Sequence, residues 1–167
     1  MKTIRNPEGV HHPLAAYSHQ IELDASERLL VLSGQIGMRP DGSVPDDPIE
    51  QLKITLDNIR LNLDAANMSV SDVVKLTIYL VGQFDPDDRR RILSDYFEAV
   101  APCMTLLFVA ALGAPRLKVE IDAIASSDRG QHRPADRERA GCQLTLPFLR
   151  ARRADRPAGG HQPQVGG

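Results

Sequence analysis

Two acidic side chains in a short apolar stretch are the first candidates for chemistry. Glu120 and Asp122 lie inside the run Lys118–Ala125 and are separated by one residue. Side chains of a β-strand alternate between its two faces, so both carboxylates would share one face and Val119 and Ile121 the other. Two carboxylates on one face of an apolar strand are costly unless that face meets solvent, a partner subunit or a ligand. The spacing therefore predicts a site on this face.

The acidic run is one of several predicted strands. Thr105–Ala110 precedes it, and the turn signal Gly113–Pro115 lies between the two runs. Val73–Val81 is rich in β-branched residues and is predicted to be a central strand. Three short strands are predicted nearer the N-terminus, and the last two have the spacing of a β-hairpin. They are Ile4–Asn6, Tyr17–Leu23 and Arg28–Leu32.

Two helices are predicted from their start signals. An acidic N-cap residue followed by proline occurs at Asp47-Pro48 and again at Asp85-Pro86. Glu50 completes a capping-box pattern in the first helix, and apolar residues then recur at steps of three and four. This pattern predicts a helix over Pro48–Asn67, and the second signal predicts a helix that ends at about Val100.

The predicted order of elements is ββ-α-β-α-ββ. Strands mixed with two amphipathic helices indicate an α+β fold, in which a single mixed β-sheet carries both helices on one face. The strands also have apolar residues on their other side. A symmetric oligomer is the natural way to cover that second face.

Composition and charge narrow the class of protein. Apolar residues make up 42% of the 167 residues, as in globular domains, and no apolar run reaches the ~18 residues of a membrane span. Residues 1–127 carry 12 Lys and Arg against 18 Asp and Glu, a net charge of −6, which disfavours nucleic-acid binding. Residues 128–167 carry 8 against 4 and are rich in Arg, Gly and Pro, so a disordered tail is expected there. No signal-peptide core is present, and a cytoplasmic protein is expected.

Other reactive side chains give weaker signals. The adjacent pair His11-His12 has no evident third ligand nearby, so no metal site is predicted. Arg89-Arg90-Arg91 falls in the first turns of the second helix and is either a solvated face or a contact for an anion. The two cysteines, Cys103 and Cys142, lie far apart and are expected to be free thiols.

Several short motifs together resemble the Rid/YjgF family over residues 3–127. They are Tyr17-Ser18, Ser33-Gly34-Gln35-Ile36, Asn58, Val73-Val74-Lys75, Asp95-Tyr96-Phe97, Pro102, Val109-Ala110 and Val119 to Ala125. The resemblance implies a fold like the chorismate mutase of Bacillus, a homotrimer, and ligand sites in clefts between subunits. It also implies hydrolysis of reactive enamines and imines such as 2-aminoacrylate, without metal or cofactor.

The resemblance assigns roles to individual residues. Glu120 matches the glutamate that activates water, Tyr17 matches a pocket tyrosine, and Ser33 and Gly34 match the segment whose backbone lines the pocket. The family's substrate-binding arginine is absent, because Met104 stands in its place. A thioether cannot donate hydrogen bonds to a carboxylate, and it adds flexible apolar surface instead.

Three functions follow from this departure. The first is a hydrolase of the same chemical type that acts on a larger, more apolar substrate bound by Cys103 and Met104. Arg90 or Arg116 would supply a displaced anchor for its carboxylate. The second is a small-metabolite-binding protein without catalysis. The third is thiol chemistry at Cys103 with His19 as the base, for which the sequence shows no proximity.

Overall fold

The structure is a computed structural model that describes residues 2–98 and 100–128. The described residues form six strands, two α-helices and one short 3₁₀-helix. The elements are β1 (Lys2–Arg5), β2 (Gln20–Leu23), β3 (Arg28–Ile36), α1 (Pro48–Ala65), η1 (Val70–Asp72), β4 (Val73–Leu80), α2 (Pro86–Phe97), β5 (Cys103–Phe108) and β6 (Val119–Ser127). Except for Asp128, the predicted tail lies outside the described residues, as does Cys142.

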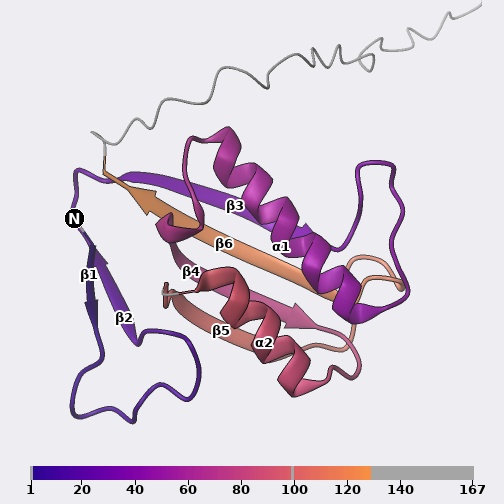
Figure 1. The fold of residues 1–167 in the computed structure, drawn as a ribbon, viewed down its shortest axis with the longest axis horizontal. Helices are drawn as coiled ribbons and strands as arrows, with labels where there is room; N and C mark the ends of the chain where they lie inside the picture. The colour runs from indigo at the N-terminus through magenta and orange to yellow at the C-terminus, as the bar shows by residue number, and fades with distance from the viewer. Residues whose placement is uncertain (1, 99, 129–167) are drawn as a thin grey trace, which may run out of the picture. The chain divides into compact units, whose positions relative to one another are not determined.

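Four strands form a mixed sheet in the order β3-β6-β4-β5. β6 pairs antiparallel with both β3 and β4, whereas β4 and β5 run parallel, with α2 in the crossover between them. Both helices lie on one face of this sheet (Figure 1). The predicted α+β fold, with a mixed sheet and two helices on one face, is confirmed.

The predicted hairpin between residues 17–23 and 28–32 is wrong. β2 pairs instead with β1, in a separate two-stranded antiparallel sheet that joins Lys2 to Leu23 and Arg5 to Gln20. A polar connection of four residues fits a hairpin locally, but the pairing of short strands depends on partners elsewhere in the chain. The Lys2 side chain links β1 to η1 through the Ser71 carbonyl (3.0 Å) and Asp72 (3.6 Å).

The core lies between the helices and the sheet. Buried residues alternate with half-buried ones over residues 74–80 of β4 and 119–125 of β6, which is the pattern of a sheet with one covered face. The core residues that are fully shielded from solvent include Leu52, Ile59, Leu63, Leu76, Ile78, Leu80, Val119 and Ile121. Burial of these aliphatic side chains supplies the main stabilisation of the fold.

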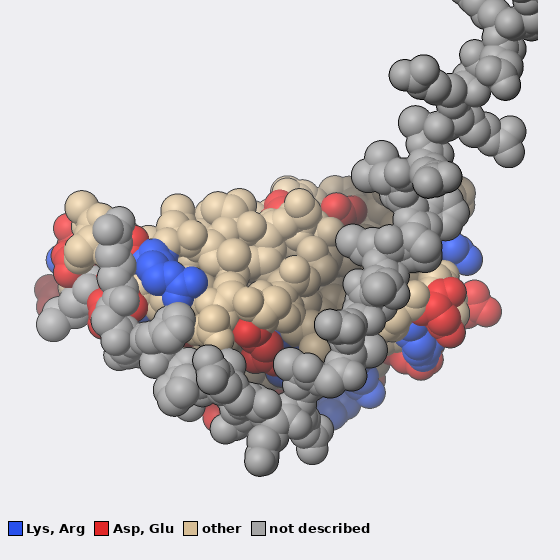
Figure 2. Space-filling model, turned by 90° about the horizontal axis from the view of Figure 1, so that it is seen from above, with Lys and Arg blue, Asp and Glu red and all other residues tan. Residues whose placement is uncertain are grey.

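The opposite sheet face stays partly apolar and uncovered. Leu29 and Val31 of β3 are 60% and 68% exposed, and Leu107 of β5 is 40% exposed. Figure 2, seen from above the view of Figure 1, shows mostly uncharged side chains across the middle of the surface in view. An apolar face of this kind is typical of surfaces that meet a partner.

The helix caps follow the sequence signals with one exception. The Asp47 carboxylate accepts a hydrogen bond from the Ile49 N–H (3.0 Å), as an N-cap should. Glu50 does not complete the capping box among the described contacts, because its carboxylate forms an ion pair with Arg39. Asn67 ends the helix in the left-handed region (φ 54°), as predicted.

Tyr96 of α2 gives the fold a pH-dependent contact. Its hydroxyl donates to the Leu56 carbonyl of α1 (2.8 Å), and burial raises the pKa of this phenol to about 12. Since the folded pKa lies above the unfolded value of about 10, the contribution is complete below pH 10 and is lost as the pH rises through 12. We expect Tyr96 to contribute about 1 kcal/mol to this alkaline loss, after allowance for solvent screening of a half-buried group.

Urea unfolding at pH 9 and pH 11.5 measures this effect. The Tyr96→Phe variant should be less stable than wild type at pH 9 and should lose less stability between the two pH values. An equal alkaline loss in both proteins would contradict the assignment to Tyr96.

Candidate functional site

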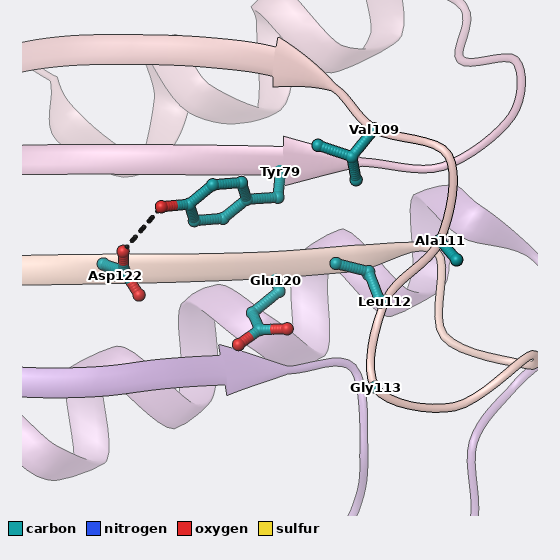
Figure 3. Close-up of a pocket in the computed structure, with 7 residues that line it drawn as sticks. All are labelled: Tyr79, Val109, Ala111, Leu112, Gly113, Glu120 and Asp122. Carbon is teal, nitrogen blue, oxygen red and sulfur yellow. Dashed lines mark hydrogen bonds between the residues drawn. The ribbon is translucent and has the colours of Figure 1, made fainter.

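A shallow hollow opens on the uncovered sheet face, at the end of β6 that carries the two acids. Its volume is about 360 Å³, and it is lined by Tyr79, Val109, Ala111, Leu112, Gly113, Glu120 and Asp122. We call it the sheet-face hollow. Glu120 and Asp122 share its floor, and Tyr79 reaches in from β4 (Figure 3). The prediction that both carboxylates share one face is confirmed.

Glu120 lies against the bare backbone of Gly34. A Cβ atom added to Gly34 would come within 2.8 Å of the Glu120 Cδ atom, closer than real side chains approach. Ser33 and Gly34 stand where β3 has one residue more than its partner, since Leu32 pairs with Ala123 and Gln35 with Ile121. The bulge therefore brings a residue without a side chain beside the carboxylate.

Asp122 is engaged, whereas Glu120 is not. The Tyr79 hydroxyl donates to Asp122 Oδ2 (3.0 Å). This hydrogen bond, with partial desolvation and the negative charges of Asp122 and Glu120, raises the pKa of the Tyr79 phenol. Among the described residues, no side-chain hydrogen bond or ion pair engages the Glu120 carboxylate. Glu120 is therefore the carboxylate of the pair that can accept a proton from a bound molecule.

Two amide side chains of α1 hold the loops around the hollow. Gln51 is fully buried; its Nε2 donates to the carbonyls of Pro45 (2.8 Å) and Arg116 (2.9 Å), and its Oε1 accepts from the Lys118 N–H (2.8 Å). Asn58 Nδ2 donates to the carbonyls of Ile36 and Met38, both at 3.0 Å. These bonds tie the end of β3 and the start of β6 to one helix.

A second pocket lies between α2, β5 and the loop that precedes β2. Its volume is about 430 Å³, and it is lined by Leu14, Ala15, Ala16, Tyr17, Arg89, Arg90, Leu93, Ser94, Met104 and Leu106. We call it the α2–β5 pocket. It brings together three of the predicted site residues, Tyr17, Arg90 and Met104.

The two cavities lie on opposite faces of the sheet. Met104 pairs with Leu76, a fully buried core residue, and packs partly against the core. Glu120 pairs with Tyr79 on the uncovered face. Within one protomer the water-activating candidate and the pocket around Met104 are therefore separated by the thickness of the sheet.

Cys103 is the neighbour of Met104 but faces the other way. Its strand partner is Lys75, which lies on the uncovered face, so strand alternation separates Cys103 from the α2–β5 pocket. The His19 ring is not positioned to activate this thiol. Its Nε2 lies 2.6 Å from the His11 carbonyl, and no hydrogen bond joins His19 to Cys103 in the part of the chain that is described.

The three arginines of α2 have different surroundings. Arg90 pairs with Asp87 (2.9 Å) and Arg91 with Asp88 (2.7 Å), and both are largely exposed. The Arg89 guanidinium instead lies over the Phe108 ring, 5.9 Å from its centroid. Sequence reasoning did not separate Arg89 from its neighbours. The signal was present, since only Arg90 and Arg91 have an acid three residues before them.

Metal ligation finds no support in the described residues. Within 2–98 and 100–128, no group of three or more His, Cys, Asp or Glu side chains is arranged to hold an ion. His11 Nδ1 lies 2.8 Å from the carbonyl of His12, so the two histidines do not converge on a common centre. No helix in the same part of the chain is long and apolar enough to cross a membrane.

The fold agrees with comparisons of the chain with known proteins. Residues 9–127 match the family model described as endoribonuclease L-PSP. The chain belongs to this family, which is the Rid/YjgF family predicted from its motifs.

Three relatives show the extent of the similarity. RutC family protein PH0854 of Pyrococcus horikoshii is 32% identical over 127 residues, which cover 75% of this chain and 98% of that protein. The 2-iminobutanoate/2-iminopropanoate deaminase of Rattus norvegicus is 35% identical over 114 residues, which cover 67% of this chain and 80% of the rat protein. The crystal structure of the Rid family protein YyfB of Yersinia pestis matches with a TM-score of 0.67 and 28% identity, covering 75% of this chain and 98% of that one.

Proposed function

We propose that this protein hydrolyses a reactive imine or enamine of an amino acid with a larger, more apolar side chain than 2-aminoacrylate. The observation that carries the proposal is the Glu120 carboxylate, which is unengaged among the described residues and borders an open hollow beside Gly34. The rat relative is named as an imine deaminase, which supports the same reaction type here. No metal or cofactor is required by this chemistry.

In the proposed reaction Glu120 accepts a proton from water as the water oxygen attacks the imine carbon. A C–O bond forms while the π-electrons of the C=N bond move to nitrogen, which takes up a proton from solvent. Glu120 then gives its proton to the amine nitrogen and takes the proton of the new hydroxyl as the C–N bond breaks, so that ammonia leaves and the 2-oxo acid remains. Because the Tyr79 hydroxyl donates a hydrogen bond to Asp122, the Asp122 carboxylate does not compete with Glu120 for the same water.

The site is proposed to form between protomers of a homotrimer. The sheet-face hollow of one protomer supplies Glu120 together with the Ser33 and Gly34 backbone. The α2–β5 pocket of the next protomer supplies Tyr17, Met104, Arg89 and Arg90. The separation of the two cavities within one chain and the exposed apolar residues Leu29 and Val31 support this arrangement.

The apolar lining of the α2–β5 pocket favours the altered substrate. Met104, Leu93 and Leu106 present aliphatic surface that the side chain of a small enamine such as 2-aminoacrylate would leave uncovered. Cleavage of RNA is not proposed, although the family model carries a ribonuclease description. The net charge of −6 over residues 1–127 opposes binding to a phosphate backbone.

A second candidate is a metabolite-binding protein without turnover, favoured by Met104 in the position of the family arginine. Ammonia release from imines freshly generated by an L-amino acid oxidase distinguishes the two. We expect the protein to accelerate release from the imines of phenylalanine and leucine more than from the imine of alanine. Binding without acceleration for any of the three would select the non-catalytic function.

A further inference from the structure

Arg89 is the arginine best placed to hold an anion in the α2–β5 pocket. Its side chain is half-buried and lines the pocket together with Met104 and Leu106. No ion pair to Arg89 is present in the described part of the chain, whereas the guanidinium groups of Arg90 and Arg91 each pair with an aspartate of the same helix. Arg89 therefore has donors available to a ligand.

The contact with Phe108 orients this guanidinium. The Phe108 ring lies 5.9 Å from the Arg89 Cζ atom. The guanidinium carbon lies over the ring face, so N–H donors that point away from the ring stay available to a carboxylate. Met104, Leu106 and Phe108 alternate along β5 on one face, which continues the apolar surface from the pocket to the arginine.

We propose that Arg89 replaces the missing family arginine as the carboxylate anchor, and that the pocket selects 2-imino acids with aromatic or branched aliphatic side chains. This inference rests on the proposed function, because it assigns the substrate class of the same site. The carboxylate takes the edge of Arg89 in a bidentate pair. The apolar side chain of the ligand lies along Met104, Leu93 and Leu106. A volume of about 430 Å³ lies within the usual range of small-molecule sites, about 300–1,000 Å³.

The displaced anchor explains how the chain tolerates methionine at position 104. An arginine there would project a charge from β5 into the pocket. With the charge on α2 instead, the strand side of the pocket is free for apolar contact. Anion binding is thereby kept while the preferred side chain of the ligand becomes larger.

Calorimetric titration of the full chain with 2-oxo acids, the stable products of the proposed reaction, tests the inference without turnover. Phenylpyruvate should bind at least about ten-fold more tightly than pyruvate, because its ring buries apolar surface. Arg89→Ala should weaken phenylpyruvate binding at least about ten-fold, through loss of a charge-assisted bidentate pair. The matched control is Arg91→Ala, which removes an exposed arginine outside the pocket and should leave affinity within about two-fold.

A compensating variant sharpens the test. Adding Met104→Arg to Arg89→Ala should restore pyruvate binding but not the preference for phenylpyruvate. Equal affinity of wild type and Arg89→Ala for phenylpyruvate would overturn the inference, as would a loss confined to Arg90→Ala. Binding that depends on Arg89 in a protein that fails to hydrolyse imines would uphold the anchor and refute the proposed hydrolysis. Turnover that is unaffected by Arg89→Ala would uphold the proposed hydrolysis and refute the anchor role of Arg89.

Discussion

The Glu120→Gln variant is expected to release ammonia from its imine substrate at least about 10²-fold more slowly than wild type, the range of a lost general base. An amide has nearly the same shape as the carboxylate but cannot take a proton from water at neutral pH. The packing against Gly34 should therefore survive the change. Stopped-flow detection of imine loss, with stability checked by thermal unfolding, measures the effect.

The control for this variant is the other acid of the hollow. Asp122→Asn keeps a hydrogen bond to Tyr79 and should reduce turnover far less than Glu120→Gln does. Comparable losses of turnover in the two variants would contradict the assignment of Glu120 as the single general base.

Mixed trimers test whether the base acts on a neighbour's pocket. Each of two variants, Glu120→Gln and Met104→Trp, should be inactive as a homotrimer. In a cyclic trimer that contains both chains, one interface has an intact Glu120 facing an intact pocket, so about one-third of wild-type activity should return. Co-expression with two affinity tags isolates these mixtures. A site built within one protomer would recover nothing.

Replacing Gln51 is expected to have the largest effect on stability. Gln51→Met keeps much of the side-chain volume but leaves two carbonyls and one N–H without their partner in the interior. Each buried group left unsatisfied costs about 1–3 kcal/mol, so we expect a loss of about 3–5 kcal/mol in the free energy of unfolding. Urea unfolding of the full chain measures it.

The same helix offers a matched control. Lys53→Met adds a similar side chain at an exposed position of α1 and should change stability by less than about 0.5 kcal/mol. A loss of less than about 1 kcal/mol for Gln51→Met would show that the loops keep their positions without this amide. A folded variant with lowered turnover would instead show that Gln51 also positions the hollow.

The parts of the fold that sequence analysis predicted correctly are those that depend on neighbouring residues. The Asp47 and Asp85 caps and the shared face of Glu120 and Asp122 each follow from spacings of two to four residues. The pairing of β2 depends on which strand lies nearby in space. Local spacing predicted that β2 pairs with β3, whereas its partner in the structure is β1.

The same distinction applies to the site. Strand alternation already implied that Cys103 and Met104 face opposite ways, although the family resemblance placed both in one substrate pocket. Arg89 was missed because the three consecutive arginines were treated as one group, although only Arg90 and Arg91 have an acid three residues before them. Its stacking on Phe108 joins residues from different elements and emerges only from the structure.

The extra residue of β3 makes the site beside Glu120 sensitive to deletions in this strand. The number of residues in β3 determines that Gly34 lies beside Glu120. The extra residue at Ser33-Gly34 is accommodated before the regular pairing resumes at Gln35. Deleting either residue would straighten the strand and leave a single residue opposite Asp122, while Gln35 and Ile36 would keep Ile121 and Glu120 as their partners. A deletion that removed Gly34 would therefore take away the side-chain-free backbone beside Glu120, which substitutions elsewhere in β3 would leave in place.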